Sequence, residues 1–325
     1  MLHGKEIYIF FGKYNLCGIL GIAFSSMIVG ILINRVSKIL SLNKHIDSYN
    51  EFLDYILKDV NSKKNLVRIV NAIIDIFLLI SFYIMIAGFS AYFKQQCNLP
   101  TYITSTIICI LCYIILNKNI EGVINITVIL VPIIILFILN MGIYNFHFGI
   151  NKISNTTFNT QDMPESIASA VLYASYNSIL LLPVMVSLKK YIKKESIFYT
   201  AVIIFSIIFI LGFFIYIILL RGNTEIIELD MPIIYITKKF GKVYETLYGF
   251  VIIISIFTSV ISSGYSFLKN CTKNNKQYKK ILQFICISSV LVCNIGFSDL
   301  VNFLYPVFGI LGIVQIYYIL KIKIE

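Results

Sequence analysis

Long stretches of the chain carry almost no charge, and this constrains the fold more than any other feature. Residues 197–220 are all uncharged and mostly Ile, Leu and Phe. A helix needs about 20 mostly apolar residues to cross a bilayer. Nine stretches of the sequence reach or approach this length. These candidate spans are 16–34, 69–93, 103–116, 123–143, 167–188, 197–220, 246–268, 281–297 and 300–320.

The composition excludes a soluble protein. Of the 325 residues, 58% are hydrophobic and 13% are charged, whereas soluble domains average about 45–50% apolar and about 25% charged. The hydrophobic core of one soluble domain is too small to bury this excess of apolar residues. The apolar runs lack the alternation of a membrane β-barrel, so helices are the structure that satisfies their backbone in lipid. We expect an all-α polytopic membrane protein whose residues 1–325 form one transmembrane domain within a lipid bilayer.

The distribution of Lys and Arg among the loops indicates how the chain is oriented in the membrane. A net charge of +11 would suggest nucleic acid in a soluble protein, but most of the 27 lysines and arginines lie in alternate loops between apolar runs, such as 35–68, 189–194 and 269–280. Loops rich in Lys and Arg stay in the cytoplasm. We expect a multi-pass protein of the cell membrane with a cytoplasmic C-terminus and no nucleic-acid partner. The N-terminal residues then lie outside or within the membrane.

The fifth candidate span has an unusual polar window. Tyr173, Ser175, Tyr176, Asn177 and Ser178 follow one another at mid-membrane, before Pro183. Polar groups inside a membrane are costly and usually face a cavity or a partner. A continuous helix would spread these side chains over several faces, whereas unwinding around residues 174–177 would turn them into one cavity, as in many transporters. The alternative is a seam that packs against neighbouring helices.

Three further positions combine polar or small residues with a membrane location. Gly88 lies in a small-residue run that allows either close helix packing or approach of the backbone to a ligand. Asp75 shares a helix face with Arg68 and Asn71, so it is a candidate gate or proton carrier, or a member of a local ion pair. Ser262 and Ser263, near Thr258 and Ser259, suit Na⁺, unless their hydroxyls bond back to their own helix.

The sequence does not indicate an enzyme. His3, His45 and His147 have no metal-ligand spacing, and no nucleophile–base pair or phosphate loop is present. Cys109 and Cys112 form a CxxC within an apolar helix, where they are best interpreted as small residues tolerated by lipid. We expect no catalytic residue, no metal site and no cofactor, apart from Na⁺ as a candidate coupling ion.

Four short motifs resemble a known family. They are Gly4-Lys5-Glu6-Ile7 with Phe10-Phe11, the Met85-Ile86-Ala87-Gly88 run ending at Leu99-Pro100, Asn125 with Pro132, and Tyr173-Ala174-Ser175-Tyr176-Asn177. The chain thereby resembles the YkvI-like membrane proteins of Gram-positive bacteria, which are grouped with the LeuT-type transporters of the amino acid–polyamine–organocation superfamily. The resemblance implies ten spans in two inverted repeats, with the first and sixth spans broken at mid-membrane.

On this scheme residues 1–143 are a remnant of the first repeat and residues 167–320 are the second. The first repeat should begin with a helix ending in a motif like Gly-x-Gly-Phe-Ala-Ser-Gly-Gln/Lys-Glu. Here only His3-Gly4-Lys5-Glu6 matches it, so we expect about nine spans and no half-helix before the break. Two interpretations stay open: a start upstream of Met1, or a truncated and inactive relative.

The resemblance implies a secondary transporter of amino acids or similar small solutes, coupled to Na⁺ or H⁺. The alternative is a truncated membrane protein that does not transport and serves as a vestige, a sensor or an assembly partner. The substrate, coupling ion, direction of transport and oligomeric state are not predicted. The implied substrate site comprises Gly4, Lys5, Glu6, Gly88, Tyr173, Ser175, Tyr176 and Asn177, and the implied ion site Ser262 and Ser263.

Overall fold

The structure is a computed structural model that describes residues 4–43, 45–57, 64–148, 158–221, 232–238, 241–272, 274–293 and 297–322. Within these ranges every regular element is a helix. The α-helices are α1 (Gly4–Phe11), α2 (Cys17–Leu42), α3 (Tyr49–Ile56), α4 (Lys64–Cys97), α5 (Thr101–Leu116), α6 (Asn119–Phe148), α7 (Met163–Ser187), α8 (Ile197–Leu220), α10 (Pro232–Lys238), α11 (Lys242–Cys271), α12 (Asn275–Val292) and α13 (Phe297–Lys321).

Each of the nine candidate spans corresponds to one long helix. Among the described residues, six helices are long and apolar enough to cross a membrane: those at Cys17–Leu42, Ile69–Cys97, Val128–His147, Thr160–Ser187, Lys194–Leu220 and Lys242–Cys271. Two further apolar segments, Thr101–Leu116 and Phe308–Lys321, are shorter. The chain is therefore a helical protein with several candidate membrane spans, and the count of nine stays a prediction.

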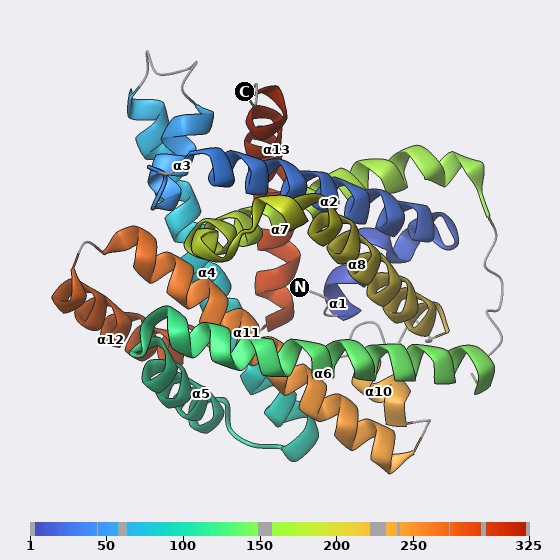
Figure 1. Cartoon of the computed structure of the whole chain (residues 1–325). Coiled ribbons are helices and arrows are strands. Elements are labelled where there is room, and N and C mark those ends of the chain that lie inside the picture. Colours follow the sequence, from blue (N-terminus) through green and yellow to red (C-terminus); the bar gives the residue numbers. More distant parts are fainter. Residues whose placement is uncertain are drawn as a thin grey trace.

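The helices pack in pairs drawn from the two halves of the chain. Helix α2 contacts α8, α4 contacts α11, and α5 contacts α12. Helix α7 packs against both α2 and α13. The short helix α1 lies inside this bundle (Figure 1), where it contacts α2, α7 and α8. The N-terminal residues that resemble the family motif are thus placed beside the polar window of α7.

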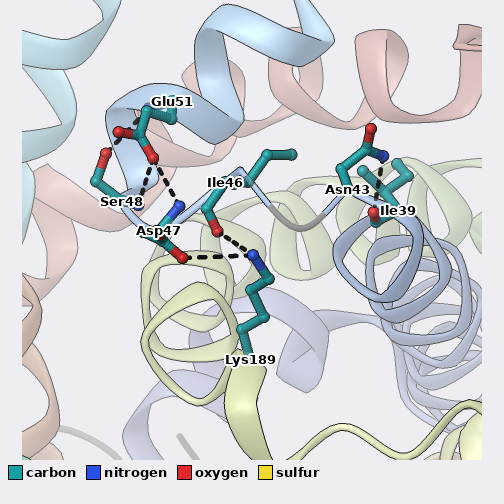
Figure 2. A network of polar contacts seen from close by, with 7 residues as sticks. All are labelled: Ile39, Asn43, Ile46, Asp47, Ser48, Glu51 and Lys189. Carbon is teal, nitrogen blue, oxygen red and sulfur yellow. Dashed lines mark hydrogen bonds and ion pairs between the residues drawn. The ribbon is translucent and has the colours of Figure 1, made fainter.

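Helix α3 is a short amphipathic helix that follows α2, with Phe52, Leu53 and Ile56 buried and Glu51 and Asp54 exposed. Its N-terminus has a capping box, because Ser48 Oγ accepts from the Glu51 backbone and Glu51 Oε2 accepts from the Ser48 backbone at 3.0 Å. Lys189, just after α7, donates to the Ile46 carbonyl at 2.8 Å and pairs with Asp47 at 3.4 Å (Figure 2). The loop before α3 is thereby attached to the end of α7.

The segment from Ile233 to Tyr248 is divided between two helices. Helix α10 ends at Lys238, and α11 begins at Lys242. Gly241 has a φ of +107°, a conformation that an α-helix does not contain and that glycine adopts readily.

Candidate functional site

Helix α7 is continuous, so the predicted break around residues 174–177 is wrong. Two polar side chains of the window bond to the helix itself, whereas the buried Ser175 hydroxyl has no hydrogen-bond partner among the described residues. Asn177 Nδ2 donates to the Tyr173 carbonyl at 2.8 Å, and Ser178 Oγ donates to the Ser175 carbonyl at 2.7 Å. These contacts give buried polar groups partners without unwinding the backbone. The window is buried among neighbouring helices, as the packed-seam alternative required, but these two side chains bond within α7 rather than across to a neighbour.

Helix α1 is held in place by hydrogen bonds from α7 and α8. The Tyr216 hydroxyl, on α8, donates to the Phe11 carbonyl at 2.9 Å and to the Asn15 carbonyl at 2.6 Å. Ser169, on α7, donates to the Phe10 carbonyl. Carbonyls at a helix C-terminus have no partner within the helix. These hydroxyls supply the hydrogen-bond donors that the carbonyls at the end of α1 need. They also fix its end against α7.

Aromatic and charged side chains of α1 meet α7 at the predicted residues. The ring of Tyr173 lies 5.2 Å from that of Phe10 and 5.3 Å from that of Phe11, in edge-to-face geometry. Glu6 is fully buried and interacts electrostatically with Tyr173. Lys5 is also buried. The structure thus brings the Gly4–Glu6 motif and Tyr173 together, as the resemblance implied.

A cavity of about 340 Å³ lies between α4, α6, α7, α8 and α11, and we call it the central cavity. One part of its wall has hydroxyl groups, and the rest is aliphatic. None of its lining residues is Asp, Glu, Lys, Arg or His. The lining residues are Ser81, Met85, Val131, Ile134, Ile135, Tyr176, Leu180, Leu181, Val184, Ile207, Ile208, Leu211, Ser255, Thr258, Ser259, Ser262 and Ser263.

The central cavity joins three predicted residues from two sites. Tyr176, predicted for the substrate, and Ser262 and Ser263, predicted for a cation, all line it. Tyr176 also packs against Phe77 of α4, with ring centroids 6.0 Å apart and the planes at 90°. Tyr176 and the two predicted ion residues are therefore parts of one cavity wall.

The hydroxyls of the cavity differ in their hydrogen bonds. Ser263 donates to the carbonyl of Ser259 at 2.9 Å, and Thr258 and Ser259 each donate to that of Ser255 at 2.9 Å. These three bond back to their own helix, as the alternative for this cluster required. In the part of the chain that the structure describes, the hydroxyls of Ser81, Ser255 and Ser262 make no hydrogen bond. These three hydroxyls, on α4 and α11, are available to bind a solute or a cation.

Seven of the eight predicted substrate residues, all except Tyr176, do not line the central cavity. Ser175 is fully buried and its backbone lies against α13, where a Cβ on Gly312 would come within 2.2 Å of the Ser175 carbonyl oxygen. Asn177 bonds to its own helix. Gly88 is buried in α4, on a helix that packs against α11. Gly4 contacts α10, where its added Cβ would lie 2.4 Å from the Ile233 side chain. Gly4 and Ser175 therefore lie where two helices pack closely together.

Asp75 is part of a polar network rather than of the cavity. Its Oδ1 accepts from Asn270 Nδ2, on α11, at 3.1 Å. Tyr49 of α3 is buried and bonds to Gln315 of α13. Burial raises the pKa of the Tyr49 phenol, and the nearby Asp75 carboxylate acts in the same direction. The side chain of Arg68, the proposed ion-pair partner of Asp75, lies outside the described residues.

Sequence reasoning missed Ser81 and Tyr216. Ser81 is a lone serine between apolar Ile80 and Phe82 of α4, and Tyr216 lies in an almost entirely apolar α8, so neither has a local signal. Among the described residues no group of His, Cys, Asp or Glu could hold a metal ion. All seven cysteines are free, and Cys109 lies 2.9 Å from the Ser289 hydroxyl across the α5–α12 contact.

The fold and the cavity define an all-helical membrane protein with several candidate spans. No family model matches the chain. It is similar to the uncharacterized membrane protein YkvI of Bacillus subtilis (strain 168), with 24% identity over 309 residues, which cover 94% of this chain and 86% of that relative. The similarity supports a YkvI-like membrane protein over nearly the whole length of the chain. The name of this relative states neither a substrate nor an activity.

Proposed function

We propose that the chain is a secondary transporter whose solute binds in the central cavity. The observation that carries this proposal is the cavity itself. Helices α4, α6, α7, α8 and α11 line it, and three hydroxyls, those of Ser81, Ser255 and Ser262, are available to a ligand. Cavities at the junction of several membrane helices are where transporters hold their solutes. Polar groups there are expensive, so a functional role accounts for their presence.

The pairing of helices supports two repeats of related structure. If α1, α2, α4, α5 and α6 are compared in order with α7, α8, α11, α12 and α13, the first four members of each set contact their counterparts. Contacts between α13 and α4 likewise correspond to contacts between α6 and α11. This agrees with the proposal that residues 1–143 and 167–320 are inverted repeats of a LeuT-type fold.

The chemistry of the cavity indicates how a small solute would be held. The aliphatic wall, which includes Ile134, Leu180 and Ile207, suits the apolar part of the solute. The hydroxyls of Ser81 and Ser262 suit its polar group. A small amine-bearing solute, amino acids first, is the class that the resemblance implies. A Na⁺ ion beside Ser262 and Ser263, or a proton carried by Asp75, would provide the coupling.

The test is uptake of labelled amino acids into proteoliposomes, with no gradient, with a Na⁺ gradient and with a pH gradient. We expect gradient-dependent uptake that falls strongly in a Ser81→Ala, Ser262→Ala double variant. Ser206→Ala is the matched control, because Ser206 bonds to its own helix α8 at 2.9 Å and does not line the cavity. Equal uptake by the double variant and the wild type would contradict the site assignment.

One observation favours the alternative, a membrane protein that does not transport. The unbroken helix α7 keeps its backbone groups bonded, so they are not offered to a solute as in a broken helix. This alternative expects no ligand-induced change in melting temperature across a panel of small solutes. A reproducible shift that the Ser81→Ala, Ser262→Ala variant loses would favour the transporter.

A further inference from the structure

A second cavity lies beneath the amphipathic helix α3 and is separate from the central cavity. It has a volume of about 270 Å³ and is enclosed by α3, α4, α7 and α13. We call it the α3 cavity. Its lining residues are Leu53, Ile56, Leu57, Ile69, Val70, Ile73, Ile74, Phe77, Ile179, Phe308, Leu311, Val314, Gln315 and Tyr318. Nearly all of them are aliphatic or aromatic, and none is Asp, Glu, Lys, Arg or His.

Gln315 is the one amide in this lining. Its residue is only 6% exposed. Its Nε2 donates to the Tyr49 hydroxyl, whereas its Oε1 is buried and makes no hydrogen bond to any described residue. A buried carbonyl oxygen without a partner is costly, and such groups usually have an explanation. A ligand in the cavity that donates a hydrogen bond would supply the missing partner.

The lining of the α3 cavity includes residues on the exposed surface of the helices. Ile69 of α4 is 56% exposed and Val314 of α13 is 51% exposed, and both belong to its lining. In a protein embedded in a bilayer, exposed aliphatic side chains on such helices contact acyl chains. An amphiphile can therefore enter from the bilayer between α4 and α13, without first crossing water.

We propose that the α3 cavity binds an uncharged membrane amphiphile with a hydroxyl headgroup, such as a monoacylglycerol. The acyl chain would contact the aliphatic lining, and the hydroxyl would donate to Gln315 Oε1. A hydroxyl also accepts hydrogen bonds, so it fits the amide with its oxygen and nitrogen in either arrangement. A carboxylate headgroup only accepts, and the lining has no cation to balance a charged one. This inference does not depend on the transport proposal.

A tryptophan reporter tests the proposal directly, because the chain contains no tryptophan. Tyr318→Trp places the reporter in the lining of the α3 cavity, in the full chain purified in detergent. The quenchers are a dibrominated monoacylglycerol and the methyl ester of the same acid, which lacks the hydroxyls. Phe284→Trp is the control reporter, because Phe284 lies on α12, is 65% exposed and lines neither cavity.

We expect saturable quenching of Tyr318→Trp, with half-quenching at a roughly fivefold lower mole fraction for the monoacylglycerol, the factor that one hydrogen bond of about 1 kcal/mol gives. Adding Gln315→Leu should abolish this preference, whereas adding Tyr49→Phe should preserve it. Phe284→Trp should show no preference. Equal quenching of Tyr318→Trp by both probes, or a preference that survives Gln315→Leu, would overturn the proposal. Every variant must elute as a single folded species.

Discussion

The ring of Tyr176 lies almost parallel to that of Phe10, with the centroids 6.4 Å apart and the planes at 16°. Tyr176 also lines the central cavity. One side chain of α7 therefore contacts both the buried N-terminal helix and the cavity wall. Any displacement of α1 would change the support of Tyr176, so the bonds that hold α1 bear on the proposed site.

Tyr216→Phe should loosen α1. The change removes the hydroxyl that donates to the Phe11 and Asn15 carbonyls at 2.9 and 2.6 Å. Leaving buried acceptors unpaired costs about 1–3 kcal/mol. We expect a lower melting temperature of the purified protein. Tyr199→Phe is the control, because Tyr199 is 69% exposed on the same helix. An equal effect of the two substitutions would contradict this role of Tyr216.

Gly312→Ala should separate α7 from α13. Its Cβ would lie 2.2 Å from the carbonyl oxygen of Ser175, a backbone atom that moves only with its helix. Gly309→Ala tests the same contact more mildly, because its Cβ would lie 3.1 Å from the Leu172 carbonyl oxygen. Overpacking costs about 1–3 kcal/mol, so we expect Gly312→Ala to have the larger effect on the denaturation midpoint. The reverse order would show that the helix contact is not as close as described.

Lys189→Ala should release the loop before α3. Lys189 donates to the Ile46 carbonyl at 2.8 Å, and its side chain is 18% exposed, whereas that of its ion-pair partner Asp47 is 82% exposed (Figure 2). Exposed ion pairs contribute about 0–1 kcal/mol. We therefore expect Asp47→Ala to change proteolysis of this loop little and Lys189→Ala to speed it clearly. Equal protection in both variants would show that the carbonyl bond does not hold the loop.

The substitution Asp75→Asn distinguishes two roles of Asp75, that of a proton carrier and that of a structural hydrogen-bond acceptor. An amide still has an oxygen to accept from Asn270, so the melting temperature should stay close to that of the wild type. An amide does not carry a proton, however, and we expect uptake driven by a pH gradient to disappear. Unchanged proton-driven uptake in this variant would leave Asp75 as a structural residue.

Parts of this architecture follow from sequence, and parts depend on packing. The uncharged run at residues 197–220 has few options other than a membrane helix, and α8 begins and ends at those residues. The polar window of α7 was ambiguous because Asn177 can bond either to a ligand or to the Tyr173 carbonyl of its own helix. The aliphatic cavity wall was unpredictable, because Ile207 at the cavity and Ile203, which is 57% exposed, look alike in sequence.

Filling the central cavity is the most direct test of the central claim. Ser262→Phe places a large ring in a cavity of about 340 Å³, where the protein can accept it without unfolding. Ser206→Phe on α8, outside the lining, is the matched control. The measurement is uptake into proteoliposomes of a solute that the wild type accumulates. The account predicts uptake at background level for Ser262→Phe and wild-type uptake for Ser206→Phe. Wild-type uptake by a folded Ser262→Phe variant would contradict it.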